Sequence, residues 1–122
     1  MLITEIDTVP RRRAPVPGGP TAVTLTAPDT SAQVAVVHLE IPADGGMPEH
    51  DHGVSEVVLI PLSGSLELWH DGRPRTLAPG MTAHIAAGER VSLANSGSEP
   101  ACLMAVVSPP QFAERLAAWP LA

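Results

Sequence analysis

Proline and glycine interrupt this chain at short intervals, and they limit its regular structure more than any other sequence feature. The 122 residues include 14 prolines and 10 glycines. Because proline cannot donate to a helix or strand ladder and glycine weakens element interiors, short strands joined by tight turns are favoured over long helices. A chain of this length forms one domain, and 44% hydrophobic residues can supply its core. The sequence therefore predicts a single all-β domain.

Short apolar or alternating runs lie between these turn residues. We expect strands over 21–27, 33–41, 56–62, 82–86, 90–95 and 101–108, and a hairpin over 65–77. Asp71-Gly72 at the centre of the hairpin is typical of a two-residue turn, in which both residues adopt positive φ. Phe112, Leu116 and Trp119 recur at helical spacing and predict a short C-terminal helix. Strands without intervening helices indicate a sandwich or barrel, with a jelly roll favoured.

The first 20 residues have a different composition from the rest. Arg11, Arg12 and Arg13 are followed by alternating proline and glycine up to Pro20. We interpret this segment as a flexible, solvated linker, with an anion-binding arm as the alternative. The predicted organisation is an N-terminal arm over 1–20 and a β-domain with its C-terminal helix over 21–122.

Charge and cysteine content exclude several kinds of function. The formal net charge is -6, and nucleic-acid binding needs a positive surface, so no nucleic-acid partner is expected. Cys102 is the only cysteine, which rules out an internal disulfide and a zinc site built on several thiolates; its apolar neighbours indicate a small buried side chain. The sequence shows neither a signal peptide nor a segment long enough to span a bilayer, so we expect a cytoplasmic protein without membrane contact.

Residues 48–56, PEHDHGVSE, place two histidines one residue apart among carboxylates. Because alternate strand positions share a face, His50, His52 and Glu56 project from the same surface. Two imidazoles and a carboxylate on one face suit Fe(II), Mn(II) or Ni(II), and they can also hold Zn(II). An exposed polar turn with solvated side chains explains the same spacing equally well.

Two longer segments resemble the motifs of the cupin superfamily. GGMPEHDHGVSEVVLIPLSGSLEL resembles the first motif, in which two histidines and a glutamate line a small jelly-roll barrel and bind a divalent metal. LAPGMTAHIAAGERVSLANSGSEPACLMAVV resembles the second motif through Pro79-Gly80, Gly88 and Asn95. The resemblance runs from residue 34 to residue 110 and implies a single-domain cupin-type jelly-roll β-barrel.

The resemblance also assigns roles to individual residues. It implies that His50, His52 and Glu56 are metal ligands, and that Glu56 can exchange metal ligation for a catalytic base role. The family normally supplies a fourth ligand, a histidine, three residues after the glycine matched by Gly88; here Val91 stands at that position. His84 is the one plausible substitute.

The spacing after Glu56 departs from the family pattern as well. One residue more than usual lies between Glu56 and Gly64. We assign it to a β-bulge at Pro61 and keep Glu56 on the inner face.

These features predict a small metal-dependent enzyme that acts on a small organic molecule as an oxygenase, isomerase or cyclase. The absence of lysine, tyrosine and a Gly-x-Ser-x-Gly elbow argues against Schiff-base, phenolic-acid and serine-hydrolase chemistry. The alternative is a cupin that has lost catalysis and serves as a small-molecule or metal-binding module, which Val91 favours. A structural β-sandwich with a polar loop at His50 is a third hypothesis. We also expect a homodimer, because small cupins commonly pair and a partner would cover a barrel edge.

Overall fold

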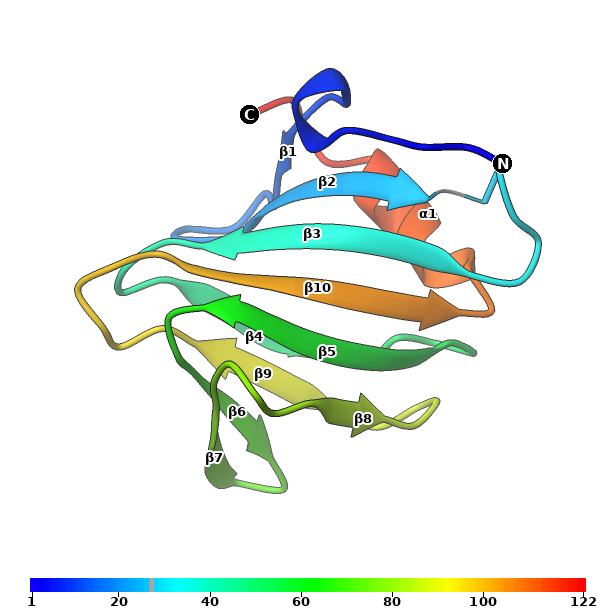
Figure 1. Cartoon of the computed structure of the whole chain (residues 1–122). Coiled ribbons are helices and arrows are strands. Elements are labelled where there is room, and N and C mark those ends of the chain that lie inside the picture. Colours follow the sequence, from blue (N-terminus) through cyan, green and yellow to red (C-terminus); the bar gives the residue numbers. More distant parts are fainter. Residues whose placement is uncertain (27) are drawn as a thin grey trace.

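Two antiparallel sheets face one another in the computed structural model, which describes residues 1–26 and 28–122. Most of the larger sheet lies above the smaller one in the view of Figure 1. Ala27, the last residue of the strand predicted over 21–27, lies outside the described residues. The elements are η1 (Ile6–Thr8), β1 (Arg12–Arg13), β2 (Thr21–Thr26), β3 (Ala35–Ile41), β4 (Gly46–His50), β5 (Glu56–Ser63), β6 (Leu66–His70), β7 (Arg73–Leu77), β8 (Ala83–Ile85), β9 (Val91–Ala94), β10 (Ala101–Ser108) and α1 (Gln111–Ala117). The predicted all-β class is confirmed.

The strand order separates the chain into a six-stranded and a four-stranded sheet. The larger sheet runs β1-β2-β3-β10-β5-β8 and the smaller runs β4-β9-β6-β7. The predicted hairpin is β6–β7, and Asp71 and Gly72 at its turn both adopt positive φ, at 52° and 73°. Neighbours such as β3 and β10 are far apart in sequence, so the sheets depend on long-range pairing.

Side chains alternate between the barrel interior and the outer surface along the central strands. In β10 every second residue from Ala101 to Val107 is buried, and in β5 the buried residues are Val57, Leu59 and Pro61. The apolar interior lies between the two sheets, where side chains of alternate parity meet. Cys102 has the opposite parity and is only half-buried on the outer face of β10, so the sequence overestimated its burial.

A β-bulge interrupts β5 where the sequence predicted one. Cys102 pairs with Ser63 and Leu103 pairs with Pro61, which leaves Leu62 without an opposite residue. The bulge nevertheless does not place Glu56 inside, because Val57 and Leu59 hold the inner positions between Glu56 and the bulge.

The arginine run is part of the structure and is not the solvated linker that the sequence predicted. Arg12 and Arg13 form β1, which pairs with β2. Arg12 also donates to the Trp119 carbonyl at 2.8 Å, and Ala14 is 3% exposed. Two consecutive arginines carry no apolar alternation that could predict this pairing. The first three residues remain exposed.

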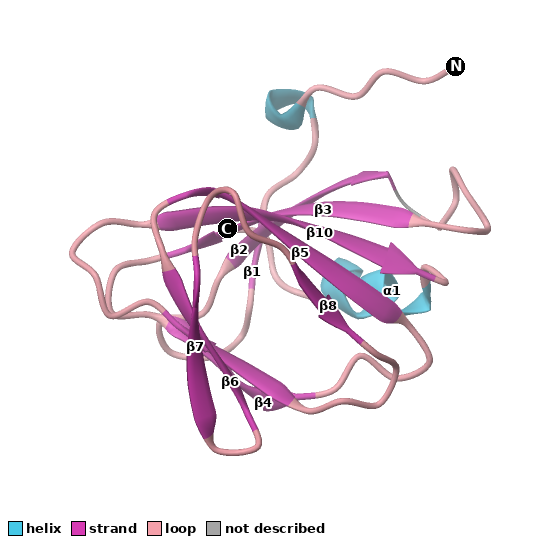
Figure 2. Cartoon of the chain, turned by 60° about the horizontal axis from the view of Figure 1, so that its bottom comes forward, coloured by secondary structure: helices cyan, strands magenta, loops and turns pink. Residues whose placement is uncertain are grey.

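Helix α1 packs against the larger sheet and closes one side of the barrel interior. Figure 2 shows it beneath β3 and β10. The helix that the spacing of Phe112, Leu116 and Trp119 predicted is thus present and ends at Ala117, and the three side chains line the interior. Within residues 1–26 and 28–122, no helix is long and apolar enough to cross a membrane.

Candidate functional site

The two histidines of the sequence motif meet inside the barrel. His50 ends β4 and pairs with Val91 of β9, and His52 follows in the turn that leads to β5. Both line a small cavity of about 50 Å³. Its other walls are aliphatic or aromatic, and they include Val37, Leu39, Met47, Val57, Leu59, Ile85, Val91, Leu93, Phe112, Leu116 and Trp119. The sequence allowed an exposed polar turn with solvated side chains as an alternative to a metal site. The structure differs from that alternative, because the two histidines point inward.

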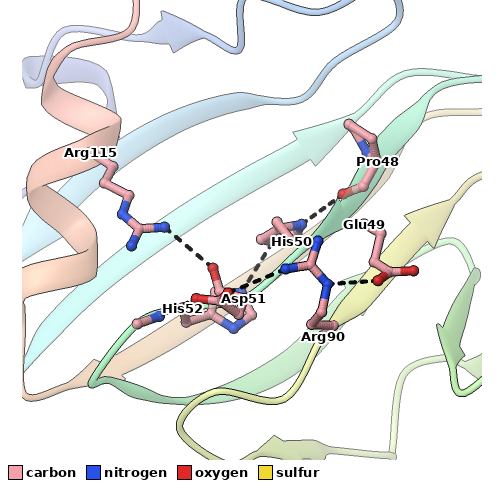
Figure 3. Close-up of polar contacts among 8 residues, drawn as sticks. Pro48, Glu49, His50, Asp51, His52, Arg90 and Arg115 are labelled. Carbon is pink, nitrogen blue, oxygen red and sulfur yellow. Dashed lines mark hydrogen bonds and ion pairs between the residues drawn. The ribbon is translucent and has the colours of Figure 1, made fainter.

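Hydrogen bonds fix the orientation of both rings, as Figure 3 shows. His50 Nδ1 lies 2.8 Å from the Pro48 carbonyl oxygen, so this nitrogen carries a proton and donates it. A neutral imidazole carries one ring proton, so with the His50 proton on Nδ1 the Nε2 atom of His50 accepts from His52 Nε2 at 3.2 Å. His52 Nδ1 is buried and has no hydrogen-bond partner among the described residues. The pair thus contains one unpartnered polar atom in an apolar setting.

His52 is uncharged at neutral pH. The residue is 6% exposed. Burial, helped by the adjacent His50 and by Arg115, lowers the pKa of His52 to about 4, although Asp51 acts in the opposite direction. Desolvation disfavours the charged imidazolium, so this ring serves as a hydrogen-bonding group.

Helix α1 is tied to the histidine loop through Ser55, whose side chain is fully buried. The Ser55 hydroxyl donates to the Pro109 carbonyl at 2.6 Å and accepts from the Phe112 amide at 3.3 Å. The Phe112 ring packs edge-on against His52, with 4.6 Å between centroids. The sequence analysis did not identify Ser55. Its position just before β5 gave no chemical signal, because serine is common in turns.

The acids on either side of the histidines face away from the cavity. Arg90 donates to Glu49 at 2.7 Å and lies 3.4 Å from Asp51, as seen in Figure 3. Asp51 also accepts from the Gly53 amide at 2.8 Å, and this hydrogen bond lowers the pKa of Asp51. Gly53 has a φ of 62°, which turns the chain back toward β5. Glu49 and Asp51 therefore stabilise the loop, and their carboxylates do not line the cavity, where they could bind a metal.

Glu56, the predicted third ligand and catalytic base, is not brought together with the histidine pair. It starts β5 on the outer face, and its carboxylate lies 2.8 Å from His84 Nε2. His84, the predicted substitute ligand, is on β8, which pairs with β5 on the outside of the barrel. The Glu56 side chain is 60% exposed and the His84 side chain 59% exposed. The two candidates thus pair with each other, because the alternation of β5 puts Val57 inside.

Two valines occupy the interior positions beside the histidine pair. Val57 and Val91 are 2% and 4% exposed, and both line the cavity with His50 and His52. The structure thus places Val91 on the inner face, as the resemblance implied. The motif predicts a carboxylate facing the interior at the start of β5, but the inward-facing residue there is Val57, one residue after Glu56. The run VVLI is apolar at every position, so the sequence does not show which of its residues face inward.

The donor set does not fit a divalent metal held by three or four protein ligands. Two nitrogens bound to one metal at about 2.0–2.1 Å lie about 3.0–3.4 Å apart, and the 3.2 Å between the Nε2 atoms agrees with that spacing. Val57 and Val91 offer no donor for further positions. Over the described part of the chain, no three histidine, cysteine, aspartate or glutamate side chains are grouped to hold a metal ion.

Several solved structures share this fold. The polyketide cyclase RemF from Streptomyces resistomycificus is 22% identical, with a TM-score of 0.78 over 89% of this chain and 80% of that chain. A predicted oxalate decarboxylase from Thermotoga maritima is 15% identical, with a TM-score of 0.77 over 88% of this chain and 98% of that chain. KdgF from Halomonas sp. is 14% identical, with a TM-score of 0.75 over 88% of this chain and 94% of that chain. At these identities the likeness shows a common fold.

The sequence itself also matches a known family. Residues 37–107, more than half of the chain, match the family described as Cupin domain. No curated protein sequence matches the chain. The matched segment contains His50, His52 and most of both sheets. The fold and the family match agree, and the chain belongs to the cupin family.

Proposed function

We propose that this cupin binds a small, mainly apolar organic molecule inside its barrel without a resident metal. The molecule would place a hydroxyl group against the His50–His52 pair and donate its proton to His52 Nδ1. One observation carries the proposal: the half-buried His50 and the buried His52 line an apolar cavity, and the His52 Nδ1 atom has no partner within the described residues. This choice corresponds to the non-catalytic alternative that Val91 favoured in the sequence.

The energetics of burial support a polar ligand group at the pair. A buried polar atom without a hydrogen bond costs about 1–3 kcal/mol, and a ligand that supplies the bond recovers part of this cost. The aliphatic walls would at the same time bury the apolar body of the ligand. The free Nδ1 atom of an uncharged His52 is an acceptor, which favours an uncharged ligand group that donates a hydrogen bond.

The size of the cavity limits how a ligand can enter. Its volume of about 50 Å³ is well below the roughly 300–1,000 Å³ of typical ligand pockets. Phe112, Leu116 and Trp119 form the wall contributed by the C-terminal segment. We therefore expect α1 to shift outward when the ligand binds, which requires the contacts of Ser55 to loosen.

A metal-dependent enzyme is the second candidate, and the Nε2 separation favours it. At 3.2 Å, His50 and His52 could hold a divalent metal through two protein ligands. Such an ion would supply Lewis-acid chemistry when bound. Fold relatives include a polyketide cyclase and a predicted oxalate decarboxylase, so the fold is one in which enzymes occur.

Elemental analysis of untagged protein separates the two candidates. If the protein binds its ligand without a metal, the purified protein should contain far less than one metal ion per chain and should not bind Zn(II), Ni(II) or Fe(II) tightly. One equivalent of tightly bound metal, lost in His50→Gln, would establish the second candidate instead. Glu56→Gln is the matched control, because its side chain lies outside the barrel and its loss should change neither result.

Three probes of equal shape test the polar ligand group directly. Cyclohexanol should shift the NMR signals of the His52 ring and the Phe112 amide, whereas cyclohexanone, which has no proton to donate, and cyclohexane should do so more weakly. His52→Phe should remove the preference for cyclohexanol. Equal binding of all three by the wild type would contradict hydrogen bonding at the pair.

The homodimer expected from the sequence remains a proposal. The outer face of the larger sheet carries half-buried apolar side chains, including Val58 and Ile60 of β5 and Met104 and Val106 of β10. Pairing of two such faces would bury them. Light scattering that gives the mass of one chain at micromolar concentration would rule this out.

A further inference from the structure

The barrel has a second hollow, which lies between the edges of the two sheets. β7 is the last strand of the smaller sheet and β8 the last strand of the larger one, and neither pairs with the other. An open cleft of about 730 Å³ lies along them, within the range of small-molecule sites. This cleft is separate from the histidine cavity but shares two wall residues with it, Ile85 and Val91.

Two arginines project toward this cleft from the inner face of β7. Arg73 and Arg75 have the same parity as Leu77, which is buried in the core. Their partners across the hairpin are His70 and Leu68, which share the inner face of β6 with buried Leu66. Alternation therefore directs both guanidinium groups to the side on which the barrel has its interior.

The acids of the cleft are already engaged, and the arginines are not. Glu89 lies 3.2 Å from His70 Nε2 and accepts from the Ala86 amide at 2.7 Å. Asp71, at the hairpin turn, lies 3.7 Å from His70 Nδ1. Within the residues that the structure describes, Arg73 and Arg75 make no ion pair and no side-chain hydrogen bond. The cleft thus presents two available guanidinium groups.

The floor of the cleft is apolar. It is formed by Leu68, Leu77, Ile85 and Val91, and Met81 contributes an exposed side chain nearby. Arginine forks bind carboxylates through paired hydrogen bonds, and an apolar floor favours a hydrocarbon body. Together they match a molecule with an acidic head and a short apolar chain.

We propose that the β7–β8 cleft binds a small amphipathic carboxylate, with Arg73 and Arg75 holding its head and the aliphatic floor holding its chain. This site goes beyond the function proposed for the histidine cavity, which favours an uncharged group. Ile85 and Val91 form the wall between the two sites. The competing explanation is that the inward arginines only prevent other chains from pairing with the exposed edge of β7.

Calorimetry with octanoate, and with octan-1-ol as the uncharged control, tests the proposal. The wild type should bind octanoate more tightly than the alcohol, and added salt should weaken only the octanoate complex. Arg73→Gln/Arg75→Gln should weaken octanoate binding by about tenfold or more, because charge-assisted hydrogen bonds are lost. Arg13→Gln removes a charge from an exposed residue of β1 and should leave the affinity unchanged.

His50→Gln distinguishes this site from the histidine cavity. Octanoate affinity should be unchanged in His50→Gln. If His50→Gln lost octanoate binding while the arginine double variant kept it, the cleft proposal would be overturned and the proposed function would stand. Failure of the wild type to bind octanoate would also overturn the cleft proposal. Unchanged octanoate affinity in the double variant would overturn it too. Aggregation of that variant with unchanged affinity would support the competing explanation, in which the arginines only protect the edge of β7. Arg75→Gln alone, with a smaller loss, checks that the double variant has not simply misfolded.

Discussion

The histidine pair inside the barrel and the histidine–glutamate pair outside it have opposite character. His50 and His52 contact each other in an apolar cavity, and His52 is 6% exposed. His84 pairs instead with Glu56 on the outer surface, where both side chains are about 60% exposed. Inside, burial keeps His52 uncharged and leaves one nitrogen without a partner in the described chain. Outside, water and a carboxylate satisfy the ring. The comparison teaches that the face of the strand, more than the residue type, decides what a histidine can do here.

The largest effect should come from removing interior packing. Leu103 is fully buried at the centre of β10, so Leu103→Ala should lower the free energy of unfolding by about 2–5 kcal/mol through lost burial and a cavity. Urea denaturation followed by circular dichroism measures this. Leu62→Ala, at a residue that is 49% exposed in the β5 bulge, is the matched control and should change stability by less than about 0.5 kcal/mol. Similar losses in both variants would contradict the assigned inner and outer faces.

Adding donors inside should convert the histidine cavity into a metal site. Val57→Glu/Val91→His should bind Zn(II) at least about a hundredfold more tightly than the wild type, because a carboxylate and an imidazole then join the histidine pair. Without metal the variant should be destabilised by its buried carboxylate, so a Zn(II)-dependent rise in Tm is a second readout. The control, Val58→Glu/Val91→His, places the carboxylate on the outer face. Equal affinity in the two variants would show that residue 57 does not face the pair.

Acidification should destabilise the interior pair. The pKa of His52 is lowered to about 4, so between about pH 6.5 and pH 4 the unfolded chain binds a proton that the folded chain does not. Stability from this group is fully present above pH 6.5 and is lost as the pH falls toward 4, by at most about 3 kcal/mol. Denaturation of metal-free protein over this range measures the slope. His52→Gln should flatten it, and an unchanged slope would mean that the ring is more hydrated than its burial indicates.

The contact between α1 and the histidine loop should depend on a single buried hydroxyl. Ser55→Ala leaves the Pro109 carbonyl and the Phe112 amide without their partner, at a cost of about 1–3 kcal/mol. Hydrogen exchange at Phe112 and Ala113 should accelerate, because α1 loses its attachment. Ser108→Ala removes an exposed hydroxyl that donates to Gln33 and should have little effect on either measurement. Unaltered exchange in Ser55→Ala would mean that packing of Phe112 alone holds the helix.

The smallest effect should come from the outer pair. Glu56→Gln breaks an exposed contact with His84 and should change the unfolding free energy by less than about 1 kcal/mol. It should not alter ligand or metal binding at the histidine pair. Loss of binding in this variant would restore Glu56 as a site residue and would show that β5 can present its other face.

The sequence by itself determined the fold class and the pair at the centre of the site. Turn residues at short intervals and alternating strands predicted the all-β barrel, and the spacing of Phe112, Leu116 and Trp119 predicted the short C-terminal helix. His50 and His52 were identified because identical side chains at alternate positions share a face whichever face it is.

Tertiary structure decided which face each strand turns inward. The run VVLI after Glu56 is apolar at every position, so its sequence does not say whether residue 56 or residue 57 faces the core; pairing of β5 with β10 and β8 settles this in favour of Val57. Long-range contacts likewise ordered Arg12 against Trp119 and turned Arg73 and Arg75 toward the cleft. A one-residue choice of register moves every side chain to the opposite face, and this choice depends on partners distant in the chain.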